Sequence, residues 1–116
     1  MQISDAVRQE DGQYHISTKL NPAHKLFEGH FPEQPILPGV VMMELIRQCA
    51  QNISNQKLKL KSASAVKFLS LIDPVKNPDL TVKIKMDQLE EDFKVKAVLN
   101  QDDKDCFKQQ AVFEIG

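Results

Sequence analysis

The chain is organised around an apolar stretch that reads Pro38-Gly39-Val40-Val41-Met42-Met43-Glu44-Leu45-Ile46. Between Val40 and Ile46 only Glu44 is polar, so a helix formed here would be apolar around most of its circumference. Pro38 suits the first helical position, where the N–H group that proline lacks would have no partner. The stretch therefore predicts a largely buried helix from about Pro38 to Asn55.

The segments on both sides of this helix are typical of β-strands, because apolar and polar residues alternate along them. Before it, two short strands are expected between about Ile3 and Leu20, joined by a turn at Glu10–Gln13. After it, the turn residues at Glu90–Asp92 and Asp102–Asp103 indicate hairpins, so much of the sheet should be antiparallel. The four strands expected after the helix are Ser62–Leu69, Leu80–Leu89, Phe93–Gln101 and Cys106–Ile115.

This order of elements predicts an α+β fold in which an antiparallel sheet wraps around one long helix, in a single domain over residues 1–116. Such a sheet has unpaired edges, and pairing them with a second copy of the chain would satisfy them, so a dimer is expected. The alternating run Lys57–Lys61 is interpreted as a basic connector or a solvated edge strand.

Composition excludes several classes of protein. The 116 residues carry a formal net charge of −1, with 15 basic and 16 acidic residues, so a non-specific nucleic-acid binder is not expected. Cys49 and Cys106 do not form a disulfide framework and are interpreted as reduced thiols. Neither a secretory signal nor an apolar run of membrane-spanning length is visible, so the expected location is the cytoplasm.

The loop before the helix, residues 21–38, is both rigid and apolar. Pro32, Pro35 and Pro38 fall within seven residues and exclude a helix interior or a central strand. Loops held in place by a scaffold are where functional residues collect. Candidate site residues are therefore expected in this loop and at the start of the helix.

A histidine, a Pro-Gly pair and a carboxylate follow one another here. His30 could exchange a proton near neutral pH. Glu44 stands in an apolar helix turn, so loss of hydration is expected to raise its pKa and let it serve as an acid. The amides of Gly39 and Val40 have no acceptor within their own helix and suit a carbonyl oxygen that gains charge. Together these groups could remove a proton beside a thioester carbonyl and expel a hydroxyl group.

A purely structural interpretation competes with this chemistry. Glu44, Arg47, Gln48 and Gln51 share one helix face and could form a solvated stripe. Histidines are more often structural or solvated than catalytic, and His15 and His24 are interpreted so. Phe31 and Met42–Met43 are expected in the core or in the wall of a tunnel. The residues by themselves leave the function open.

The stretch resembles the 3-hydroxyacyl-acyl-carrier-protein dehydratases of fatty-acid synthesis, which are hotdog-fold proteins. The matching residues keep the family's spacing without gaps, and they are Gly29-His30-Phe31-Pro32, Pro35, Pro38-Gly39-Val40, Glu44 and Gln48. A weaker match covers Val66-Lys67-Phe68, Asp73-Pro74-Val75 and Pro78-Asp79-Leu80.

The resemblance implies a role for each matched position. His30 would remove the C2 proton, and Glu44 from the other subunit would assist departure of the 3-hydroxyl group, as an acid or through a water molecule. The Gly39 amide would hold the thioester carbonyl with Val40 nearby, and Gln48 would orient Glu44. Phe31 would line the apolar path of the acyl chain at the dimer interface.

No metal or organic cofactor is implied by the resemblance. The implied partners are a second copy of the chain, with higher oligomers left open, and an acyl carrier protein that presents the substrate on phosphopantetheine. Carrier proteins of this type are acidic, so Lys67 or the Lys57–Lys61 run could dock one. The implied pathway is fatty-acid synthesis or related polyene or lipid synthesis.

Two departures from the family pattern bear on the chemistry. Glu33 replaces a glycine and could narrow the entrance to the site. Arg47 replaces a small residue, and pairing with Glu44 would lower the carboxylate's pKa and oppose a role as acid. Two other functions therefore remain open: a hotdog acyl thioesterase, which would release free acid, and a non-catalytic acyl-carrier binding module.

Overall fold

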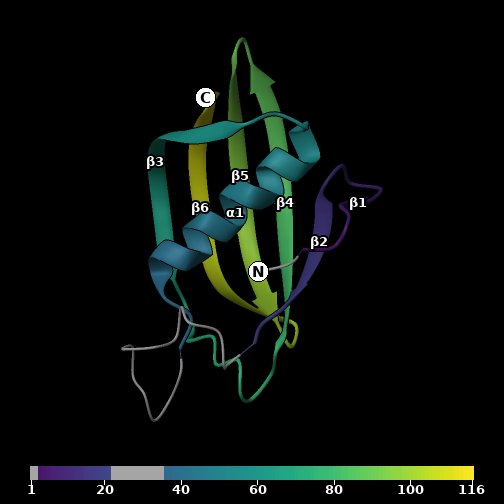
Figure 1. Cartoon of the computed structure of the whole chain (residues 1–116), viewed down its shortest axis with the longest axis vertical. Coiled ribbons are helices and arrows are strands. Elements are labelled where there is room, and N and C mark those ends of the chain that lie inside the picture. The colour runs from purple at the N-terminus through teal and green to yellow at the C-terminus, as the bar shows by residue number, and fades with distance from the viewer. Residues whose placement is uncertain (1–2, 22–35) are drawn as a thin grey trace.

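The computed structural model describes residues 3–21 and 36–116 of the chain, in which one helix lies against one six-stranded sheet (Figure 1). The loop expected over residues 21–38 therefore lies largely outside the described residues. The elements are β1 (Val7–Arg8), β2 (Tyr14–Lys19), α1 (Gly39–Ser54), β3 (Leu58–Phe68), β4 (Asp79–Leu89), β5 (Asp92–Gln101) and β6 (Lys104–Ile115).

The strands lie in the order β1-β2-β4-β5-β6-β3, and every neighbouring pair is antiparallel. Hairpin turns join β4 to β5 and β5 to β6, as their turn residues predict. Figure 1 shows α1 lying diagonally across one face of the sheet. The expected α+β hotdog architecture, a sheet wrapped around one helix, is confirmed.

The helix begins and ends within one residue of the prediction. At its C-terminus Asn55 adopts a left-handed conformation (φ 56°), and its amide donates to the carbonyl of Gln51 at 2.8 Å, which satisfies a terminal carbonyl group. The buried face consists of Met42, Leu45, Ile46, Cys49 and Ala50.

Val40 is an exception in the helix that was expected to be largely buried. This residue, in the first turn of α1, is 76% exposed.

The sheet contributes the other half of the core, with side chains that alternate inward and outward. Burying each such side chain contributes roughly 1.5–3 kcal/mol relative to leaving it in water. The largest fully buried side chains of the sheet strands are Ile16, Leu80, Val82, Ile84, Val95, Leu99, Phe107 and Phe113.

Strand β3 begins at Leu58, four residues before the predicted start at Ser62, so the basic run is part of the strand rather than a connector. Leu58 pairs with Ile115, its carbonyl accepts from Arg47 and its amide donates to Gln51 Oε1, which is why the strand starts there. Because β3 ends the strand order, its interpretation as an edge strand is confirmed. Its side chains are exposed almost throughout.

Both cysteines are free and buried, as expected of reduced thiols. Burial raises the pKa of the Cys49 thiol to about 12, and burial also raises that of Cys106. Within the described part of the chain, no helix is long and apolar enough to cross a lipid bilayer.

Candidate active site

The start of α1 leaves two amide groups available to a ligand. Pro38 caps the helix with extended backbone (φ −68°, ψ 149°), and its carbonyl accepts hydrogen bonds from Val41 and Met42, each at 3.1 Å. The first amides, those of Gly39 and Val40, meet no acceptor among the described residues. No acidic side chain stands in the first turn. Two free N–H groups at the positive end of a helix can bind a carbonyl oxygen that gains negative charge.

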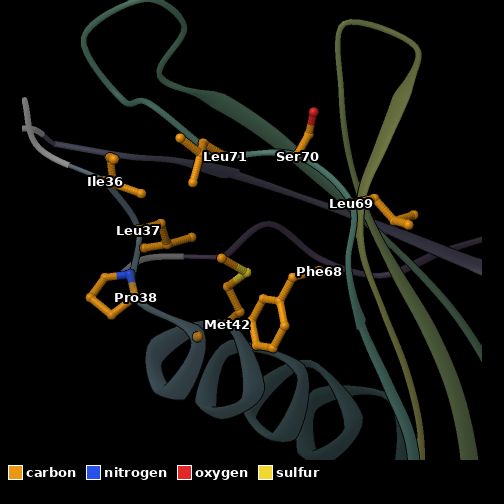
Figure 2. Close-up of a pocket in the computed structure, with 9 residues that line it drawn as sticks. Ile36, Leu37, Pro38, Met42, Phe68, Leu69, Ser70 and Leu71 are labelled. Carbon is orange, nitrogen blue, oxygen red and sulfur yellow. The ribbon is translucent and has the colours of Figure 1, made fainter.

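A cavity of about 400 Å³ opens beside this helix start (Figure 2). Its volume falls within the range of small-molecule sites, and its walls are almost entirely apolar. Figure 2 shows the ring of Phe68 beside Met42 above the helix, with Leu37 on the other side of Met42. The lining residues are Ile36, Leu37, Pro38, Gly39, Met42, Phe68, Leu69, Ser70 and Leu71.

Contacts from two directions set the shape of this cavity. The amide of Leu37 donates to the carbonyl of Ile72 at 2.9 Å, which ties the chain before the helix to the segment after β3. The ring of Phe68 packs against Phe107, with centroids 5.0 Å apart and planes tilted by 57°. These contacts hold the helix start and the end of β3 together.

The ring of Phe68 approaches the backbone of Gly39 closely. A β-carbon at this position would lie 2.8 Å from Cε1 and 2.9 Å from Cζ of that ring, closer than carbon atoms pack. Glycine therefore lets an aromatic ring and a ligand approach the same stretch of helix backbone. The Pro-Gly pair in the sequence is explained by this contact.

Glu44 is held by its neighbours on the helix. Arg47 donates to both carboxylate oxygens, from Nε to Oε2 at 2.8 Å and from Nη2 to Oε1 at 2.5 Å. Gln48 donates from Nε2 to Oε1 at 3.3 Å, the contact that the resemblance implies. Arg47 is itself held through Nη1, which donates to Gln51 Oε1 at 2.7 Å and to the carbonyl of Leu58 at 3.0 Å.

The expectation that the pKa of Glu44 rises is wrong. The hydrogen bonds from Arg47 lower that pKa most, and they outweigh the smaller effect of burial, which raises it. The side chain of Glu44 is also 47% exposed, so it keeps much of its hydration. The alternative expectation, that Arg47 pairs with Glu44 and lowers its pKa, is confirmed.

Glu44 lies in a second, smaller cavity on another side of the helix. This cavity measures about 220 Å³ and is lined by Val40, Met43, Glu44, Arg47, Leu60, Gln109 and Phe113. Of the predicted site residues, the structure thus brings Val40 and Glu44 to one cavity and Gly39 to another. Within one chain, Glu44 does not line the cavity at the helix start.

His30, Phe31 and Glu33 lie outside the described residues, as does His24. His15 is on β2, opposite Val7 and Lys83, and lines neither of the two cavities at the helix start. Met42 is buried and lines the larger cavity, which confirms its expected place in a core or tunnel wall.

Two residues of these cavities did not stand out in the sequence. Phe68 appeared there only as part of a weak match, since a strand-end phenylalanine carries no signal for a site. Gln109 is a polar residue among the inward-facing apolar residues of β6, between Phe107 and Ala111. A polar residue at such a position in the alternating pattern is the signal by which it could have been found.

Comparison with known proteins places this geometry in a family. The sequence profile of the ApeI-like family, described as ApeI dehydratase, matches residues 6–110. A chain of the dehydratase heterocomplex ApeI:P from Xenorhabdus doucetiae superposes with a TM-score of 0.74 and 25% identity, over 98% of this chain and 99% of that one.

Curated relatives match a shorter stretch. The chain is 42% identical over 50 residues to the 3-hydroxyacyl-(acyl-carrier-protein) dehydratase FabZ of Cupriavidus necator, over 41% of this chain and 34% of that protein. It is 40% identical over 52 residues to FabZ of Brucella abortus, over 45% of this chain and 32% of that protein. The match spans about a third of the length of these relatives.

The fold extends beyond dehydratases. A candidate thioesterase, yhdA from Lactococcus lactis, has a TM-score of 0.74 at 12% identity, over 97% of this chain and 91% of that one, a likeness of fold alone. Since the family profile covers nearly the whole chain, the protein belongs to the ApeI-like dehydratase family.

Proposed function

We propose that the protein removes water from 3-hydroxyacyl thioesters carried on an acyl carrier protein and yields trans-2-enoyl thioesters, in fatty-acid or related polyene or lipid synthesis. The observation that carries this proposal is the apolar cavity of about 400 Å³ that meets the amide of Gly39, which has no acceptor among the described residues, in a chain of a dehydratase family. An acyl thioester has the matching parts, a carbonyl oxygen and an apolar chain.

In this proposal the Gly39 amide, with Val40 nearby, donates to the thioester carbonyl. Charge that develops on this oxygen when the C2 proton leaves is then stabilised by the N–H group and by the helix dipole. His30 takes the proton from C2, and the C3–O bond breaks as the C2–C3 double bond forms. The hydroxyl group gains a proton from the protonated imidazole and departs as water, so His30 returns to its starting state.

The ion pair with Arg47 defines which role Glu44 takes. A carboxylate whose pKa is lowered is ionised at neutral pH and has no proton to give. Of the two roles that the resemblance implies, action through a water molecule is therefore favoured over action as an acid. Glu44 then accepts a hydrogen bond from that water or from the 3-hydroxyl group and orients the leaving oxygen.

A second copy of the chain completes the site in this proposal. Glu44 and Gly39 line different cavities in one chain, so a Glu44 that acts on a substrate held by Gly39 comes from a partner. Strand β3 offers the surface for that partner, because it is an edge of the sheet that the described residues form and exposes Leu60, Val66 and Phe68. We take this partner to be an identical chain.

The acyl carrier protein is proposed to dock at Lys67, which is next to the cavity residue Phe68. Lys67 stands directly opposite Lys108 in the sheet, and both line a groove with Lys83 and Lys96. Adjacent like charges repel, so an acidic partner would be stabilising there. The Lys57–Lys61 run is less suitable, since Lys59 and Lys61 already pair with Glu114 and Asp92.

Mass spectrometry of purified protein with a 3-hydroxyacyl-carrier-protein substrate tests the activity. The expected result is the loss of one water molecule, abolished in His30→Ala and strongly reduced in Glu44→Ala. Glu44→Gln is the matched variant, since it keeps the size of the side chain and removes only the charge. Release of free acid would replace this proposal by a thioesterase, and binding without turnover would replace it by a carrier-binding module.

A further inference from the structure

Gln51, about one turn before the end of α1, connects the helix to the first residue of β3. Its side-chain oxygen Oε1 accepts from Arg47 Nη1 at 2.7 Å and from the backbone amide of Leu58 at 2.9 Å. Arg47 Nη1 also donates to the carbonyl of Leu58 at 3.0 Å. These three hydrogen bonds form a closed ring that fixes both side chains to the backbone of Leu58.

The guanidinium group of Arg47 passes this restraint on to Glu44. A guanidinium group is planar and carries its N–H donors in a fixed fork, so holding one nitrogen also sets the direction of the others. Nη1 faces Gln51 and Leu58, while Nε and Nη2 donate to the two carboxylate oxygens of Glu44. The position of the carboxylate therefore depends on contacts that Gln51 makes on the far side of Arg47.

The ion pair by itself would hold Glu44 only loosely. The side chains of Arg47 and Glu44 are 29% and 47% exposed, and an exposed pair of long side chains loses entropy when it is kept in one geometry. A catalytic carboxylate needs a single geometry, because a displacement of about 1 Å can lower a rate about 100-fold. The partly buried contact of Gln51 with Arg47 supplies the additional restraint.

The same ring reaches the strand along which the partner chain is proposed to pair. The amide of Gly116 donates to the carbonyl of Lys57 at 3.0 Å, so Leu58 and Ile115 between them form a pair without mutual hydrogen bonds. The amide and the carbonyl of Leu58 then face the open edge of β3, where α1 side chains bind them. Glu44 is thus placed relative to the strand that also positions the partner.

We propose that Gln51 is a positioning residue, which through Arg47 and the backbone of Leu58 holds Glu44 where this carboxylate meets the substrate of the partner chain. Gln51 lines neither cavity at the helix start, so it acts through Arg47 and does not touch the substrate. This role rests on the proposed dehydration, and it adds a residue on which turnover depends and substrate binding does not.

Kinetics of Gln51→Met test this role, since methionine has a similar length and lacks the carboxamide. The kcat for a 3-hydroxyacyl pantetheine should fall about tenfold while KM changes little, because Gly39 still holds the thioester. In a Glu44→Gln background, the same change should lower kcat no further, since the carboxylate that Gln51 positions is gone. Gln56→Met is the matched control, because this exposed glutamine lies just beyond α1 and outside the ring.

An equal fall of kcat in the Glu44→Gln background, or an unchanged kcat in Gln51→Met, would overturn the proposal. The first result would show that Gln51 acts on the fold and not through the carboxylate. The second would show that Arg47 holds Glu44 without help.

NMR of the Arg47 Nε–H group separates this failure from failure of the proposed reaction, because it needs no turnover. This proton is donated to Glu44, so it should exchange slowly with water in the wild type and in Gln56→Met, and faster in Gln51→Met. Faster exchange in a protein whose wild type dehydrates no substrate would refute the reaction alone. An exchange rate that stays the same in Gln51→Met would refute the positioning role, whatever the activity.

Discussion

The guanidinium group of Arg47 contacts both carboxylate oxygens of Glu44 and, through Nη1, the carbonyl of Leu58 at the start of β3. The candidate catalytic carboxylate is thus fixed to the helix and to the sheet edge by one side chain. Gln51 strengthens the link, because its Oε1 accepts from both Arg47 Nη1 and the amide of Leu58.

Replacing Arg47 by methionine should raise the pKa of Glu44, since the largest cause that lowers it is removed. A carboxylate with a lowered pKa stabilises the fold above its unfolded pKa, and this stabilisation is lost as the pH falls through its folded pKa. Both side chains are partly exposed, so the difference in unfolding free energy at neutral pH should be only about 0.2–1 kcal/mol. NMR titration of the Glu44 carboxyl carbon measures the pKa, and urea unfolding at several pH values measures the stability.

If ionised Glu44 orients the leaving oxygen, the acid limb of the pH–rate profile should move to higher pH in Arg47→Met. Lys94→Met, an exposed change on β5, is the control and should leave the profile where it is. A variant whose acid limb moves to lower pH would contradict the assigned ionisation state.

Gly39→Ala should reduce substrate binding more than stability. The added β-carbon would displace the ring of Phe68, which is 64% exposed and can swing away at little cost to the fold. The displaced ring changes the wall of the larger cavity, so kcat/KM should fall while the melting temperature changes little. The double variant Gly39→Ala/Phe68→Ala relieves the clash and should recover part of the lost activity, whereas equal loss in both would show that the ring is not responsible.

Reversing charge at the lysine groove should weaken docking of the carrier protein. Lys67→Glu and Lys108→Glu should lower kcat/KM for carrier-bound substrate and leave kcat/KM for the free pantetheine thioester unchanged. The effect should shrink at high salt, because exposed charges are screened. Lys59→Glu is the comparison variant, as its ammonium group already pairs with Glu114 at 3.3 Å. Equal losses with both substrates would mean that these lysines act on the site itself.

Val66→Lys should reduce dimerisation by placing a charge on the exposed edge strand. Val66 lies on β3, which is the last strand in the order of the described sheet. Light scattering during gel filtration should show a dimer for the wild type and a lighter species for the variant, together with lost activity because Glu44 of the second chain is missing. Leu89→Lys, at a more exposed apolar position at the end of β4, should remain a dimer.

Several features were predictable because they depend on neighbours along the chain. The helix around Leu45 and the inward alternation of β4, β5 and β6 follow from periods of about 3.6 and 2 residues. The hairpin turns follow from residues such as Asp102 and Asp103, which both adopt positive φ. The contact of Gln48 with Glu44 was predictable as well, since residues four apart share a helix face.

Other features depended on which segments meet in space. The exposure of Val40 depends on how the first turn of α1 packs, and the early start of β3 reflects pairing of Leu58 with Ile115. The pKa of Glu44 could be argued in either direction from the sequence, because apolar neighbours raise it and Arg47 lowers it. Only the geometry of the ion pair shows which effect is larger.

The sequence by itself determined the class of fold, the position of the helix and the motif that identifies candidate residues. Helix and strand periods and the spacing of a family motif depend only on residues that are close together along the chain. Tertiary structure alone decided that Phe68 lies close to Gly39, that Glu44 and Gly39 line separate cavities, and that the amide of Gln109 is buried with no hydrogen-bond partner among the described residues. Each of these depends on contacts between residues far apart in sequence, whose distances are set by how the sheet packs on the helix.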